Sequence, residues 1–264
     1  MVGVAMGRRS GYRFGKDLER SPKGMVDNGL GKGVAYGSFG ILPPTQRVTQ
    51  PTEELMVDAV RIVFHNVPGA EAPAELAFSV PDRKAYGGAE NLAQTLHNLL
   101  PVRGAKVRDS LRWSQYTEQA LAQTADTEVY FGQHNGPIWG NARIRQFITK
   151  QRDLCKYTHD QTVRLANAGL TPREIADTVK LPKTLESIFG VRGYCGDLRH
   201  NGKAVHQLHL GAHDGNPANL NPLPPQEAAK RWCCRTRVSR SCSGSRTRCC
   251  TTKRPPPPPM PTPR

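Results

Sequence analysis

Strand-like spacing of apolar residues occurs in three segments of the first half of the chain. In residues 55–64 and 74–80, apolar side chains stand at every second position, which predicts β-strands with one buried face. Residues 127–134 have the same character over a shorter length, and this predicted strand ends on His134. Proline- and glycine-rich stretches separate the three segments, as turns would.

Helical spacing appears between these segments. Residues 89–100 carry Leu92, Leu96 and Leu99 at i, i+4 and i+7, so we expect a helix with one buried stripe. Residues 109–124 predict a second helix. Strands and helices that alternate along the chain are typical of an α/β layer.

Beyond Asn141 the strand pattern stops and the sequence reads as helical. Residues 142–169 predict one long helix that ends at Gly169, and Thr171 and Glu174 form a capping box that starts the next one. Further short helices are expected in residues 180–193 and 201–211. Residues 1–50 are glycine-rich and poorly periodic, so we expect loops there.

The composition changes abruptly at Cys233. A helix that starts near residue 225 is expected to break off there, and residues 233–264 are rich in Arg, Ser, Cys and Pro. Such a segment buries too little apolar surface to fold, so we predict a disordered basic tail. It holds five of the seven cysteines, and the remaining Cys155 and Cys195 imply no disulfide framework.

The net charge of +15 invites comparison with nucleic-acid-binding proteins. Eight Lys and Arg residues and no acid lie in residues 233–264, however, so about half of the excess belongs to the tail. No apolar run reaches the roughly 18–20 residues of a membrane helix, and the first 16 residues contain no apolar stretch of signal-peptide length. We expect a soluble chain, cytoplasmic by default, without a membrane partner.

Three possible metal ligands follow predicted strands. Glu71 lies after the first strand region, Glu90 after the second, and His134 ends the third. Because strand ends of one layer meet at one edge of a sheet, the three groups can converge, and carboxylates with imidazole suit Zn²⁺ or Mn²⁺. Spacing alone leaves the alternatives open: a glutamate that favours a helix start, and a solvated loop histidine.

Several long stretches together resemble a known family. They include "GMVDNGLGKGVAYG", "DAVRIVFHNVPGAEAPAEL", "AENLAQTLHNLLPVRGAKVRDSLRWSQY", "HNGPIWGN", "KQRDLCKYTHDQTVRLANAGLTPREIA" and "DGNPANLNPLPPQEAAKRW". In this order they resemble the alkylsulfatases, metallo-β-lactamase-fold enzymes that hydrolyse long-chain primary alkyl sulfates such as dodecyl sulfate. The resemblance implies an α/β fold: part of a metallo-β-lactamase αββα sandwich in residues 1–140, an all-α dimerisation domain in residues 141–232, and the tail.

The resemblance also implies a site. The family holds two zinc ions, and by motif position its two glutamates fall on Glu71 and Glu90 and its later histidine on His134. Its sulfate-binding loop falls on Asn98 to Arg103. Arg103 suits a sulfate because a guanidinium offers forked donors to a tetrahedral anion; a surface arginine paired with an acid is the alternative that stays open. The implied partners are an alkyl sulfate substrate and a second copy of the chain.

Two departures from the family pattern qualify these expectations. The family's His-x-His-x-Asp-His string does not occur in the 264 residues, so we expect at most a partial metal site and doubt catalysis by this chain alone. In addition, "AVHQLHLGAHDG" carries His206, His209 and His213 where relatives tend to have aromatic residues. These histidines indicate either a second metal site or substitutions in a partly buried helix.

Two rival interpretations remain. Residues 170–193 resemble a helix-turn-helix, which with the basic charge suggests nucleic-acid binding, but the second helix begins with few side chains that read bases. Alternatively, the chain is a catalytically inactive fragment or pseudoenzyme that acts as a dimerisation module.

Overall fold

A computed structural model describes residues 3–15, 18–25, 40–193 and 195–238. The chain divides into two units, Met1–Asp214 and Gly215–Arg264, which are described separately. Most of the "GMVDNGLGKGVAYG" stretch and the tail beyond residue 238 lie outside the described residues, so the loops expected in the first and the disorder predicted for the second stay predictions. The predicted boundary between residues 140 and 141 falls inside the first unit.

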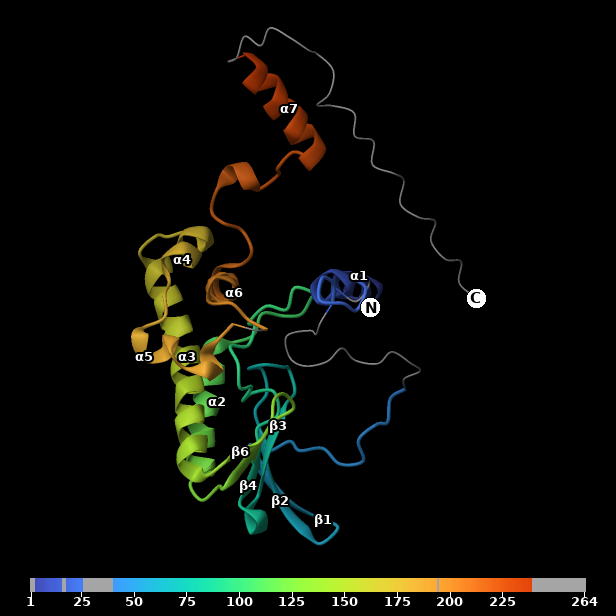
Figure 1. Ribbon diagram of the computed structural model, residues 1–264, viewed down its shortest axis with the longest axis vertical. Helices are drawn as coiled ribbons and strands as arrows, with labels where there is room; N and C mark the ends of the chain where they lie inside the picture. Colours follow the sequence, from blue (N-terminus) through green and yellow to red (C-terminus); the bar gives the residue numbers. More distant parts are fainter. Residues whose placement is uncertain (1–2, 16–17, 26–39, 194, 239–264) are drawn as a thin grey trace. The chain divides into compact units, whose positions relative to one another are not determined.

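The first unit contains a six-stranded sheet whose strand order follows the chain (Figure 1). All neighbouring pairs are antiparallel except β4 and β5, which run parallel. The strands are β1 (Thr52–Val57), β2 (Val60–Asn66), β3 (Leu76–Val80), β4 (Ala85–Gly87), β5 (Val129–Phe131) and β6 (Ile138–Trp139). The segment predicted as one strand, residues 55–64, is a hairpin, because Asp58 and Ala59 both adopt positive φ angles and turn the chain.

Two helices pack on the sheet. The N-cap carboxylate of Asp109 starts α2 (Ser110–Gln123), and α3 (Asn141–Asn167) is the long helix expected from the sequence. Their apolar faces meet the sheet in one core cluster, which consists of Ala77, Tyr86, Leu92, Ala120, Leu121, Tyr130, Ile144 and Ile148. The expected α/β class with a helical second half is confirmed.

The helix expected in residues 89–100 is absent. Leu92 packs in the cluster between the sheet and the helices, and Leu99 belongs to a second cluster with Trp113. Leu96 belongs to a third cluster, which includes Leu154 of α3. An extended path distributes the three leucines among three cores, whereas a helix would put them on one face. Leu96 also forms a bridge with Gly193, which gives this segment backbone partners outside any helix.

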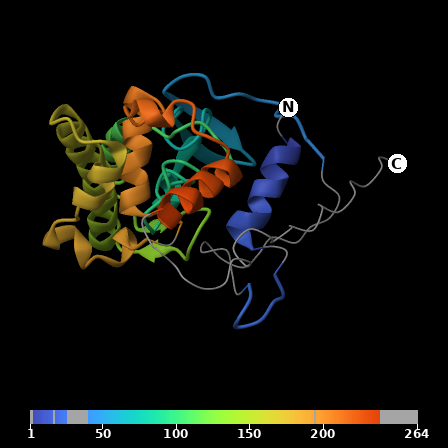
Figure 2. The same cartoon turned by 90° about the horizontal axis from the view of Figure 1, so that it is seen from above.

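Three more helices of the first unit follow α3. They are α4 (Pro172–Thr178), α5 (Lys183–Glu186) and α6 (Leu198–Leu210), with a 3₁₀ turn at Phe189–Val191. The predicted capping box is present: Thr171 accepts from the Glu174 backbone, and the Glu174 carboxylate accepts from the Thr171 backbone. Gly169 ends α3 with a φ of +87°, as predicted. Figure 2 shows α3 and α6 from above.

Two further helices differ from the sequence predictions. Residues Gly3–Phe14 form α1, although loops were expected there. In the second unit, α7 (Pro225–Val238) continues through Cys233, so the predicted break at that residue is wrong. No helix among the described residues is both long and apolar enough to cross a membrane.

Candidate functional site

The sheet brings two predicted ligands together at one edge. In the parallel pair β4 and β5, Gly87 lies opposite Phe131, so both strands end at the same edge. Glu90 and His134 each follow three residues later. Their side chains meet there, with Glu90 Oε1 2.6 Å from His134 Nε2, and both remain partly exposed.

Glu71 reaches the same edge but contacts a different partner. Because β2 and β4 are both antiparallel to β3, β2 also ends at this edge, and Glu71 lies in the loop that follows it. Its carboxylate is almost fully buried and forms an ion pair with Arg108. Arg108 Nε also donates to the Glu71 backbone carbonyl at 2.9 Å. Glu71 is thereby tied to Arg108 instead of to the Glu90–His134 pair.

Arg108 organises the predicted sulfate loop as well. Its Nη1 donates to His97 Nδ1 at 2.9 Å and to the Asn98 side-chain oxygen at 3.0 Å. Burial lowers the pKa of Arg108 to about 10, which still leaves it charged at neutral pH. Asn98 is buried, and its Nδ2 donates to Cys195 Sγ at 2.7 Å. Arg103 is partly exposed and forms no ion pair among the described residues.

Glu75 is a second buried acid beside the pair. Its Oε1 accepts from the Glu90 backbone N–H at 2.9 Å, while its buried Oε2 has no hydrogen-bond partner among the described residues. Burial raises the pKa of Glu75 to about 7; the Glu90 backbone bond opposes this rise and the Glu90 charge adds to it. Glu75 therefore holds a proton over much of the acidic range.

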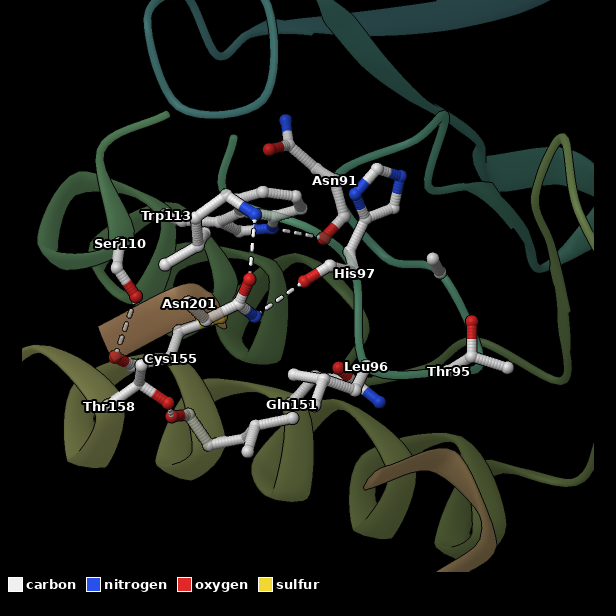
Figure 3. Close-up of a pocket in the computed structure, with 13 residues that line it drawn as sticks. Asn91, Thr95, Leu96, His97, Ser110, Trp113, Gln151, Cys155, Thr158 and Asn201 are labelled. Atoms are coloured by element: carbon white, nitrogen blue, oxygen red, sulfur yellow. Dashed lines mark hydrogen bonds between the residues drawn. The ribbon is translucent and has the colours of Figure 1, made fainter. Parts of the chain in front are cut away.

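The segment between Glu90 and the sulfate loop borders a small internal cavity of about 20 Å³, enough for one water (Figure 3). Trp113 Nε1 donates to the Asn91 carbonyl, and Asn201 Nδ2 donates to the His97 carbonyl at 2.8 Å. Arg108 Nη1 can only donate, so its contact with His97 Nδ1 favours the ring proton on Nε2, although Nδ1 also lies 3.2 Å from the Asn98 carbonyl. Nε2 is buried and has no hydrogen-bond partner in the described part of the chain. Burial lowers the pKa of His97, so the ring is neutral near pH 7.

The arrangement of Glu90, His134 and Glu71 meets only some of the requirements of a metal site. A carboxylate and an imidazole that lie side by side suit Zn²⁺, but the ion would have to replace the hydrogen bond between Glu90 Oε1 and His134 Nε2. Among the described residues, however, no three His, Cys, Asp or Glu side chains gather closely enough to hold an ion. Glu71 could join the pair only after giving up Arg108. The sequence did not single out Glu75, His97 or Arg108, since buried residues of this kind show no distinctive spacing.

Comparison with known families matches the helical part of the chain. Residues 171–235 match the family described as alkyl sulfatase dimerisation. This region begins at the Thr171 cap of α4 and includes α6 and most of α7.

Individual relatives extend the similarity to 88% of the chain. The chain is 45% identical over 232 residues to an alkyl/aryl-sulfatase of Saccharomyces cerevisiae. It is 43% identical over 233 residues to a linear primary-alkylsulfatase of a Pseudomonas species. A solved structure, the stereoselective inverting sec-alkylsulfatase Pisa1 from Pseudomonas, superimposes with a TM-score of 0.84 at 39% identity. The predicted resemblance to alkylsulfatases is confirmed. The chain spans only 36%, 35% and 37% of these three proteins, respectively.

Proposed function

We propose that this chain contributes part of a zinc-dependent alkyl-sulfate hydrolase site, acting on long-chain primary alkyl sulfates of the dodecyl sulfate type, and forms a homodimer through its helical region. The observation that carries the proposal is the Glu90–His134 contact at 2.6 Å on the edge where β4 and β5 end. The identity with alkylsulfatases over most of the chain supports the substrate class.

Each residue has a role in this proposal. Glu90 and His134 hold the ion, and Glu71 joins them when it releases Arg108. A bound zinc ion would supply a water acidified to near neutrality. Arg103 presents forked donors to the sulfate, and Asn98 presents its amide. Glu75, which stays protonated into the neutral range, fixes the backbone N–H of Glu90 and so orients that loop.

The first test counts the zinc ions that the full chain holds against a chromophoric chelator, so that the loss of one ion is seen whatever other sites bind zinc. Glu90→Ala and His134→Ala are each expected to weaken the binding of one ion at least tenfold, because the site loses one of its two or three donors. Glu128→Ala removes an exposed acid directly before β5 and serves as the matched control. If the unaltered chain and all three variants bind zinc equally, Glu90 and His134 are not zinc ligands.

The second test follows sulfate release from decyl and dodecyl sulfate, with and without added Zn²⁺. Zinc-dependent release that His134→Ala abolishes supports the hydrolase. Zinc binding without any release by the full chain supports the second candidate, a catalytically inactive dimerisation module. That candidate is favoured by the absence of a third metal donor among the described residues.

A helix-turn-helix function is not proposed. The second helix of the candidate motif, α5, comprises only Lys183–Glu186, and Leu185 is buried in the core. One turn of helix is too short to lie along the major groove and present several side chains to base edges.

A further inference from the structure

The histidine-rich end of α6 is outside the candidate site and has a neighbour on another helix. His206 is buried, whereas His209, one turn later, is exposed at the end of the helix. The His209 ring lies against that of His159 on α3, with centroids 5.4 Å apart and planes inclined by 69°. In the described part of the chain no three His, Cys, Asp or Glu side chains gather to hold an ion, so the three histidines noted in the sequence do not form such a cluster.

His159 is held by a carboxylate. Its Nδ1 lies 2.9 Å from Asp160 Oδ1, and Lys156 donates to the other oxygen of the same acid. Burial favours the neutral form of Asp160, but hydrogen bonds from Lys156 and His159 prevail and lower its pKa, so it is an anion near pH 7. An anionic acceptor favours the tautomer with the proton on Nδ1, which leaves Nε2 of His159 as the nitrogen that can bind an ion.

This arrangement resembles the outer shell of metal-binding histidines in general. A carboxylate that accepts from one ring nitrogen orients the other toward an ion and increases its basicity. The helices are fixed relative to each other, because Ala204 and Val205 of α6 pack in one cluster with Cys155 and Val163 of α3. His159 is thus a positioned donor, and exposed His209 can turn about its side-chain torsions.

We propose that His159 and His209 bind a borderline divalent transition-metal ion, of the Zn²⁺, Ni²⁺ or Cu²⁺ class, with Asp160 as the orienting carboxylate and water on the open side. Imidazole nitrogen suits these ions. This site is separate in its residues from Glu90 and His134 and does not depend on the proposed hydrolase. A bound ion links α3 to α6, which belongs to the region matched to the dimerisation family.

The test uses the full chain, labelled with ¹⁵N, and Ni²⁺ as the probe. Long-range imidazole ¹⁵N–¹H spectra report each ring separately, so metal bound by cysteines or by His134 is distinguished. We expect the His159 and His209 signals to broaden together at substoichiometric Ni²⁺. His209→Ala should abolish the broadening of the His159 ring, while His213→Ala, which removes an exposed histidine just beyond the helix, should leave it unchanged.

Two further variants complete the test. Asp160→Asn keeps the side-chain shape but removes the anion, and Ni²⁺ affinity should fall about tenfold. His206→Ala should have no effect on the broadening of His159 and His209. Loss of that broadening in His206→Ala, or independent titration of the two rings in the unaltered chain, overturns the proposal. Circular dichroism of each variant without metal confirms that the helices are intact.

Discussion

At the scale of single residues, Arg108 is the most connected polar side chain of the candidate site. It pairs with the buried Glu71 carboxylate and donates to His97 and Asn98. Arg108→Met would fill the space without satisfying these acceptors, and removing one partner of a buried ion pair typically costs 3–5 kcal/mol. We expect urea unfolding to show a loss of about 3 kcal/mol or more. The exposed Arg112→Met, with no ion pair among the described residues, should stay within about 0.5 kcal/mol. Similar losses in both variants would contradict this role.

Glu75 leads to a prediction about pH. Its folded pKa of about 7 exceeds the usual glutamate pKa of 4.5, so between these values the folded state binds more protons than the unfolded state. Stability therefore falls as pH rises through this window, by up to about 3 kcal/mol from this group. Glu75→Gln cannot titrate, and unfolding at pH 5 and pH 7.5 should show a smaller decline for this variant. Parallel declines would show that Glu75 is already ionised at pH 5.

At the scale of elements, the capping box of α4 is a local and separable contribution. The Thr171 hydroxyl accepts from the Glu174 backbone, and both the backbone and the hydroxyl of Thr171 donate to the Glu174 carboxylate. Thr171→Ala should destabilise the chain by about 1 kcal/mol, measured by chemical unfolding. Thr184→Ala removes an exposed hydroxyl from α5 and is the control. An unchanged midpoint for Thr171→Ala would mean that packing alone holds α4.

The sequence predicts an element correctly where local features, such as helix caps and a terminating glycine, fix its ends. α3 and α4 were predicted because Gly169, Thr171 and Glu174 act through neighbouring backbone groups. The segment containing Leu92, Leu96 and Leu99 was misread as a helix because its path is set by distant partners, such as Asn201, which accepts from the Leu99 N–H and donates to the His97 carbonyl. Tertiary contacts override helical spacing there.

The same distinction applies to the candidate site. Strand ends predicted that Glu90 and His134 would approach each other, and they do. The ion pair between Glu71 and Arg108 could not be predicted, because it depends on where the loop after β2 meets the segment before α2. By motif position, the resemblance gives Glu71 the role of a metal ligand. In the structure its carboxylate is paired with Arg108, and it would have to leave that ion pair to bind a metal.

At the scale of the whole molecule, the proposed homodimer depends on apolar side chains that the single chain leaves in solvent. Leu210 and Leu220 lie in the region matched to the dimerisation family and are 62% and 66% exposed. Burying such side chains against a second copy would contribute about 1.5–3 kcal/mol each, whereas placing a charge there opposes association. We expect the double variant Leu210→Glu, Leu220→Glu to raise the dimer dissociation constant at least tenfold in sedimentation equilibrium.

The control for this prediction is Leu42→Glu, which charges a leucine that is 94% exposed but lies outside the matched region. If the dimer is formed through the helical region, Leu42→Glu associates like the unaltered chain. Dissociation in Leu42→Glu would instead show that added charge disrupts association wherever it is placed. A dimer that persists in the double variant would exclude these leucines from the interface, and a monomeric unaltered chain would refute the homodimer itself. Because sedimentation reports mass and not turnover, this result holds whether or not the chain releases sulfate.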